Sequence, residues 1–155
     1  MLKPLVNFYC DACGELIHEP SHGYVEWTWT EEDDQRLDSG WRIVHHPLHS
    51  PRPNGCYADL PLSTALDEYL SSDGQARLLA FLDVGRHIRT SERRNRVKDM
   101  EEYVEFVRRL TLPHYEEARR YWSRAEQDGY FDGASEVWPY TQVALKEMIE
   151  RYADA

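Results

Sequence analysis

The chain has 155 residues and a net charge of -10, with 28 acidic against 18 basic side chains. This length suits one domain, or a small metal-stabilised module joined to a helical one. The negative charge repels phosphate backbones and disfavours binding to nucleic acid unless the basic residues are gathered in one place. We find no apolar run long enough for a signal peptide or a membrane span, so we expect a cytoplasmic protein.

The first sixty residues are rich in aromatic residues, histidine, proline and turn residues. Tyr24–Trp29 and, less regularly, Trp41–His45 alternate with a period of two, which predicts paired antiparallel strands. The acidic segment from Glu31 to Gly40 is expected to form a long connection between them. The prolines after the second strand predict an irregular loop that returns to the N-terminal region.

From residue 61 the composition shifts to helical spacing. Ser63 is expected to cap a short helix that ends at Leu70. Asp73 and Gly74 are expected to open a second short helix that reaches Leu82. These two helices are interpreted as packing elements.

A longer helix is predicted to start near residues 90–91. Its apolar residues recur with the spacing of one buried stripe, namely Val97, Met100, Val104, Val107 and Leu110. A further helix follows Pro113 and is expected to end at Asp128 and Gly129, because glycine permits a left-handed cap. The last helix is expected to begin near Pro139.

These elements predict an α+β protein. Residues 1–60 are expected to form a zinc-knuckle β-hairpin module. Residues 61–155 are expected to form a helical region with a bundle of about three main helices. The module is expected to pack on this bundle, so that both make one compact unit.

The three cysteines of the chain and a pair of histidines predict a zinc site. Cys10 and Cys13 form a Cys-x-x-Cys motif, and Cys56 follows the pair His45 and His46. Three thiolates and one imidazole suit a closed tetrahedral zinc site with one ion per chain. The sequence leaves open which histidine binds the metal and which lies beside it.

A structural role is expected for this zinc ion, because four protein ligands leave no open position for water. The loops and prolines of the first sixty residues would have little else to hold them together. The alternative is that the cysteines are merely buried and the histidines have other partners.

Part of this region resembles the HNH family of metal-dependent nucleases. The resemblance lies in Val44-His45-His46-Pro47, followed by Asn54-Gly55, with a Cys-x-x-Cys elsewhere. It implies that His45 or His46 activates a water molecule beside a metal ion. The sequence departs from the family in the later helix, which offers Asp67 and Glu68 where the family has Asn and His.

One segment of the acidic chain is strongly basic. Six basic residues lie within thirteen positions with only one acid among them, and they are Arg86, Arg89, Arg93, Arg94, Arg96 and Lys98. We expect the arginines to contact a partner, either an acidic protein or phosphates. The alternative is a solvated helix start in which Lys98 is neutralised by Glu101 and Glu102.

The sequence therefore predicts a small zinc-stabilised adaptor or regulator that binds a protein partner, without enzymatic activity. An HNH-like nuclease that uses His45 or His46 is the main alternative. A nucleic-acid-binding zinc module that uses the basic segment is a third.

Overall fold

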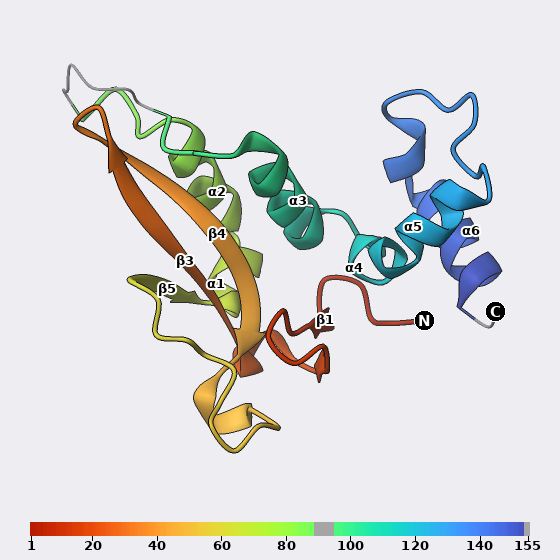
Figure 1. The fold of residues 1–155 in the computed structure, drawn as a ribbon, viewed down its shortest axis with the longest axis horizontal. Coiled ribbons are helices and arrows are strands. Elements are labelled where there is room, and N and C mark those ends of the chain that lie inside the picture. The colour runs from red at the N-terminus through yellow and green to blue at the C-terminus, as the bar shows by residue number, and fades with distance from the viewer. Residues whose placement is uncertain (89–94, 154–155) are drawn as a thin grey trace.

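The computed structural model describes residues 1–88 and 95–153 and has the expected α+β architecture. A long, twisted hairpin is its most prominent feature (Figure 1). The hairpin consists of β3 (Gly23–Glu32) and β4 (Gln35–His45), and β5 (Leu62–Ala65) pairs with the other side of β3. A separate two-stranded sheet near the N-terminus consists of β1 (Phe8–Tyr9) and β2 (Leu16–Ile17).

The predicted strands are confirmed, but the long acidic connection between them is wrong. The strands continue through this segment, with Thr30 opposite Leu37 and Glu32 opposite Gln35. Only Asp33 and Asp34 form the turn, and both have positive φ. Aspartate tolerates this conformation, and two left-handed residues match the twist of a tight hairpin.

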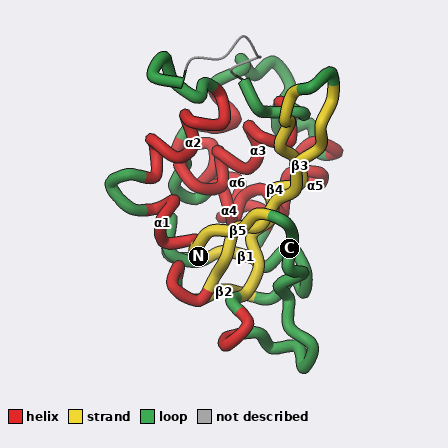
Figure 2. The backbone as a smooth tube through the Cα atoms, turned by 90° about the vertical axis from the view of Figure 1, so that its left-hand side faces the viewer, coloured by secondary structure: helices red, strands yellow, loops and turns green. Residues whose placement is uncertain are grey.

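Three helices cover one face of the larger sheet, and Figure 2 shows α1 and α2 to one side of the strands. They are α1 (Leu66–Leu70), α2 (Gly74–Leu82) and α3 (Met100–Thr111). Helix α2 runs as predicted from Gly74 to Leu82. The prediction that Ser63 caps a helix is wrong, because Ser63 lies in β5 and pairs with Glu26 of β3. Aromatic rings fill the space between sheet and helices, chiefly Trp27, Trp41, Phe81, Tyr103 and Phe106.

Helix α3 begins later than the sequence predicts. Its first residue is Met100, after Asp99, whose side chain accepts a hydrogen bond from the backbone of Glu102. Val97 lies before the helix and forms a bridge with Asp38 of β4. The predicted start at residues 90–91 lies outside the described residues.

The buried stripe of α3 is also different from the predicted one. Tyr103, Phe106 and Leu110 face the core, whereas Met100 is 47 % exposed. The observed stripe includes the aromatic residues Tyr103 and Phe106, which the predicted stripe omits. Of the predicted residues within α3, Leu110 is buried and Val107 packs, partly buried, against the same core. Arg109, next to Leu110, is also buried on this side of the helix.

A second core lies at the end of the molecule away from the hairpin (Figure 1). It is formed by short helical segments and one longer helix, which are α4 (Tyr115–Ala118), η3 (Arg119–Tyr121), α5 (Trp122–Gln127), η4 (Trp138–Tyr140) and α6 (Gln142–Tyr152). The predicted end near Gly129 is confirmed, since α5 stops at Gln127 and Gly129 has positive φ. Within the described ranges, none of the helices has the length and apolar character that a membrane span needs.

A buried arginine joins the N-terminal sheet to both helical regions. The guanidinium of Arg109 donates two hydrogen bonds to Glu116, at 2.7 and 2.9 Å, and two to Asp11, at 3.0 and 2.7 Å. A fifth goes to the backbone oxygen of Tyr9 at 3.1 Å. Asp11 and Glu116 in turn accept hydrogen bonds from the backbone of Ile43 and Tyr9. All three nitrogens of the guanidinium thereby donate hydrogen bonds.

The carboxylates around Arg109 stabilise its charged form. Burial opposes the charged form, but the carboxylates of Glu116 and Asp11 outweigh it and raise the pKa of Arg109 above its ordinary value. An uncompensated charge in this position would be costly. The network therefore fixes how α3 and α4 sit against the segment that contains Asp11.

Replacement of Arg109 tests this coupling. We expect Arg109→Gln to lower the free energy of unfolding by about 3–5 kcal/mol, because it leaves the buried carboxylate of Glu116 and the partly exposed one of Asp11 without their cation. The exposed pair of Arg77 and Glu68 offers a matched control, and Arg77→Gln should cost less than about 1 kcal/mol. Urea unfolding followed by tryptophan fluorescence measures both. Equal effects of the two substitutions would contradict the assigned role of Arg109.

Candidate metal centre

The Cys-x-x-Cys motif forms a tight turn between β1 and β2. The backbone N–H of Gly14 donates to the oxygen of Cys10 at 2.8 Å, and the N–H of Cys10 donates to the oxygen of Glu15 at 2.9 Å. Gly14 has a φ of 77°, which a residue with a side chain rarely adopts. The turn therefore places both cysteine side chains on the same side.

His45 and Cys56 reach the same point from two other segments. His45 is the last residue of β4, and Cys56 lies in the loop between β4 and β5. The ligand atoms of Cys10, Cys13, His45 and Cys56 all lie within 4.8 Å of one another. Cys10, His45 and Cys56 are buried, and Cys13 is partly exposed. The four residues, here termed the Cys3His cluster, could hold a metal ion.

The spacing of these atoms suits a tetrahedral ion. Metal–sulfur bonds of about 2.3 Å imply sulfur–sulfur edges of roughly 3.8 Å in a regular tetrahedron. The upper limit of 4.8 Å in the cluster is only slightly larger, and Cys13 Sγ lies 3.5 Å from His45 Nδ1. Small movements of the side chains would complete the coordination shell.

The thiols of the cluster oppose one another's ionisation. For Cys10, burial raises the pKa, but backbone groups of Cys13, His45 and Ala12 outweigh it, so that the pKa lies below its ordinary value. Burial and the neighbouring thiols of Cys10 and Cys56 raise the pKa of Cys13 to about 11. One thiolate is thus favoured, and ionisation of the next is resisted mainly by burial and further by the neighbouring thiols. A divalent cation removes this conflict and favours the thiolates together.

Surrounding groups orient the ligands. His45 Nε2 lies 3.3 Å from the backbone oxygen of Leu16. Since a carbonyl only accepts, Nε2 carries the proton and Nδ1 is left unprotonated toward the thiols. Ser50 Oγ lies 3.2 Å from Cys56 Sγ and can donate a hydrogen bond to the thiolate. Such outer contacts raise the affinity of a metal site.

A buried glutamate holds the loop that carries Cys56. Glu26 of β3 is fully buried and accepts hydrogen bonds from Arg42 at 2.6 Å and from the backbone of Ala58 at 3.0 Å. Arg42 also donates to the backbone oxygen of Cys56 at 3.0 Å. The hairpin thereby holds the loop at the ligand itself and two residues after it.

His46 does not join the cluster. Its Nδ1 accepts a hydrogen bond from the backbone of Leu48 at 3.1 Å, at the start of the turn η2 (Pro47–His49). Its ring packs against Tyr24, with centroids 4.8 Å apart. The choice between the two histidines, which the sequence leaves open, therefore falls on His45.

A cavity of about 210 Å³ opens beside the cluster. His45 lines it together with further imidazoles, of which His22 and His49 stack at a centroid distance of 3.8 Å. The cavity borders the cluster at His45, and none of the three cysteines lines it.

The predicted basic partner site is only partly described. Arg89, Arg93 and Arg94 lie outside the described residues. Arg86 is exposed, whereas Arg96 is partly buried and its backbone bonds to Phe81 and Asp38. Arg86 and Arg96 lie on either side of residues 89–94 in the sequence, and neither belongs to the Cys3His cluster. The interpretation that Lys98 pairs with Glu101 and Glu102 is wrong, because Lys98 Nζ bonds Glu32 of the hairpin at 2.5 Å.

Sequence reasoning missed the charged residues that support the centre, namely Asp11, Glu26, Arg109 and Glu116. Glu26 gives a partial signal, since it lies between Val25 and Trp27 in a strand that is buried on both sides. Arg109 gives none, because an arginine near the end of a helix is normally solvated.

Comparison with family models, with curated proteins and with solved structures finds no match to the chain. The function of this protein is therefore inferred from the site itself.

Exchange of each histidine for alanine tests the assignment. We expect His45→Ala to weaken metal binding by more than about 100-fold, since changes in outer contacts alone commonly cost 10- to 100-fold. His46→Ala should keep one metal ion per chain, and it is the matched control. Elemental mass spectrometry after dialysis against a competing chelator measures both. Retention of metal by His45→Ala together with its loss in His46→Ala would overturn the assignment.

Proposed function

We propose that this protein is a zinc-stabilised adaptor or regulator that binds a protein partner, with one structural zinc ion in the Cys3His cluster. The observation that carries this proposal is that four protein donors converge on one largely buried point. A closed shell of this kind holds three chain segments together and offers no position to a water molecule, which a catalytic zinc ion needs.

The donor set supports zinc as the metal. Three thiolates and one imidazole are soft or borderline ligands, which calcium and magnesium avoid. Zinc accepts a tetrahedral shell without geometric strain and without redox chemistry. Binding of the ion would stabilise the turn of Cys10 and Cys13, the end of β4 and the loop of Cys56 at once.

The outer face of α2 and the segment after it support a protein-binding role. Leu79 is 58 % exposed and Leu82 is 36 % exposed, one helical turn apart, and Ile88 follows in the exposed segment. Arg86 lies exposed between Leu82 and Ile88. Large apolar side chains beside a positive charge are typical of surfaces that bind an acidic and apolar segment of another protein.

The geometry gives less support to a nuclease. Both ring nitrogens of His45 have neighbours, at Cys13 Sγ and at the oxygen of Leu16, so neither is free to act as a base. His46 uses Nδ1 at the turn η2. The nucleic-acid alternative depends mostly on arginines outside the described residues, in a chain whose net charge is -10.

Affinity capture with paired variants tests the proposal. We expect the zinc-loaded protein to capture a specific protein from the cells that express it. The double substitution Leu79→Glu and Leu82→Glu should weaken this capture by more than about tenfold, because it places two charges in the apolar contact. Val143→Glu is the matched control, since Val143 is an exposed apolar residue on α6. Removal of zinc should unfold the Cys3His region and abolish capture.

Two results would contradict the proposal. The first is that the α2 variant and the control capture the same proteins equally well. The second is metal-dependent cleavage of nucleic acid by the purified protein that His46→Ala abolishes without loss of fold, which would favour the nuclease instead.

A further inference from the structure

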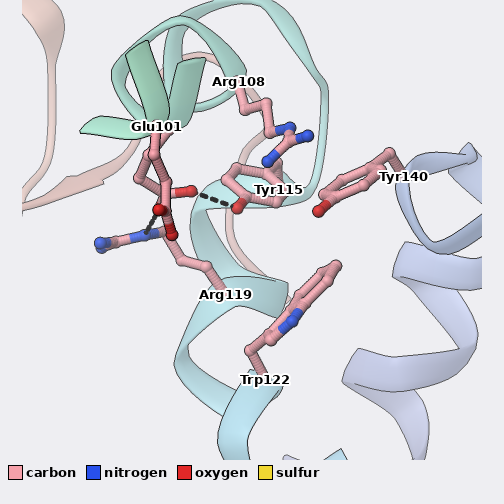
Figure 3. Close-up of a pocket in the computed structure, with 7 residues that line it drawn as sticks. Glu101, Arg108, Tyr115, Arg119, Trp122 and Tyr140 are labelled. Carbon is pink, nitrogen blue, oxygen red and sulfur yellow. Dashed lines mark hydrogen bonds and ion pairs between the residues drawn. The ribbon is translucent and has the colours of Figure 1, made fainter. Parts of the chain in front are cut away.

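A cavity of about 340 Å³ lies where α3 faces α4, α5 and η4 (Figure 3). None of the Cys3His residues lines it. Glu101, Glu105 and Arg108 line it from α3, where they share one helical face at positions i, i+4 and i+7. Its volume is within the range of sites that bind small molecules.

One carboxylate in this cavity is already fully engaged. Glu105 accepts hydrogen bonds from the hydroxyl of Tyr115 and, at 2.7 Å, from Nε of Arg119 (Figure 3). Burial and the bond to Glu105 raise the pKa of Tyr115, which keeps this hydroxyl protonated as a donor. The ion pair and the tyrosine therefore form a fixed wall, and their charges cancel.

Arg108 is the cation in the cavity that has no anion. Its guanidinium carbon lies 3.7 Å from the centroid of the Tyr140 ring, and Tyr140 stacks on Trp122 with centroids 5.2 Å apart. This column holds the planar guanidinium in one orientation. Within residues 1–88 and 95–153, the structure has no carboxylate in ion-pair contact with Arg108 and no acceptor for its N–H groups.

A second unused donor points to the same space. Figure 3 shows the Tyr140 hydroxyl and the Arg108 guanidinium directed to one region beside the Tyr115 ring. The edges of Tyr115 and Trp122 make the neighbouring wall apolar. What remains is a planar cation and a hydroxyl next to aromatic edges, in a cavity too small for more than one small molecule.

We propose that this cavity binds a small organic monocarboxylate with an apolar body. The carboxylate would accept a forked pair of hydrogen bonds from Arg108, because the two planar groups match in geometry, and a third from Tyr140. The apolar body would contact Trp122 and Tyr115. Glu101 lies exposed at the rim, and its charge disfavours phosphates and dicarboxylates, which carry more than one negative charge.

Titration with sodium benzoate, followed by two-dimensional NMR of the zinc-loaded protein, tests this site. We expect shifts centred on the Trp122 indole and a dissociation constant of about 1–10 mM, as suits a ligand of this size. Arg108→Gln should weaken binding by about 10- to 100-fold, since it removes a charged hydrogen-bonding partner. Tyr140→Phe removes only the hydroxyl and should weaken it by about 3- to 10-fold.

The controls separate this site from general effects of salt and from the metal centre. Arg77→Gln should bind benzoate as the wild type does, and benzamide, which has the same shape without the charge, should not bind. Equal shifts with benzamide, binding unchanged in both Arg108→Gln and Tyr140→Phe, or no shifts with benzoate up to about 20 mM, twice the weakest affinity expected, would overturn the proposal. The zinc content is measured on the same samples, so a failure here is distinguishable from a failure of the metal centre.

Discussion

Three separate chain segments meet at one point in the N-terminal region of this protein. The turn of Cys10 and Cys13, the end of β4 at His45 and the loop at Cys56 converge within 4.8 Å. The thiols resist joint ionisation in the absence of a cation, and a bound divalent ion reverses this preference. Metal binding and folding of the N-terminal region are therefore one process in this account, and the surrounding hydrogen bonds pre-arrange the ligands for it.

The effect of this constraint extends to the C-terminal helices through Arg109. Asp11 lies inside the Cys-x-x-Cys turn and accepts hydrogen bonds from Arg109 of α3 and from the backbone of Ile43 in β4. Glu116 of α4 binds the same guanidinium. The hydrogen-bonded chain from the cluster to α4 is thus short, and it runs through the partly exposed carboxylate of Asp11 and the buried one of Glu116. It links the two aromatic cores, and it fixes the position of α3, which lines the cavity of the proposed carboxylate site.

Much of this arrangement follows from local sequence, and the rest depends on contacts between distant residues. The spacing of Cys10 and Cys13 with a following glycine predicts the turn, and the strand pattern predicts β3 and β4. The choice of His45 over His46 depends on the register of β4 against β3, which a single sequence does not contain. Arg109 is buried only because Asp11, 98 residues away, and Glu116 lie beside it. Long-range electrostatic partners of this kind leave no periodic pattern in the sequence.

X-ray absorption spectroscopy at the zinc edge tests the central claim most directly, because it reports the atoms bound to the ion in the intact protein. We expect three sulfur neighbours at about 2.3 Å and one nitrogen neighbour at about 2.0–2.1 Å, with no additional oxygen. A shell with fewer sulfur atoms and a bound water molecule would contradict the closed structural centre, and it would indicate an open, catalytic site instead.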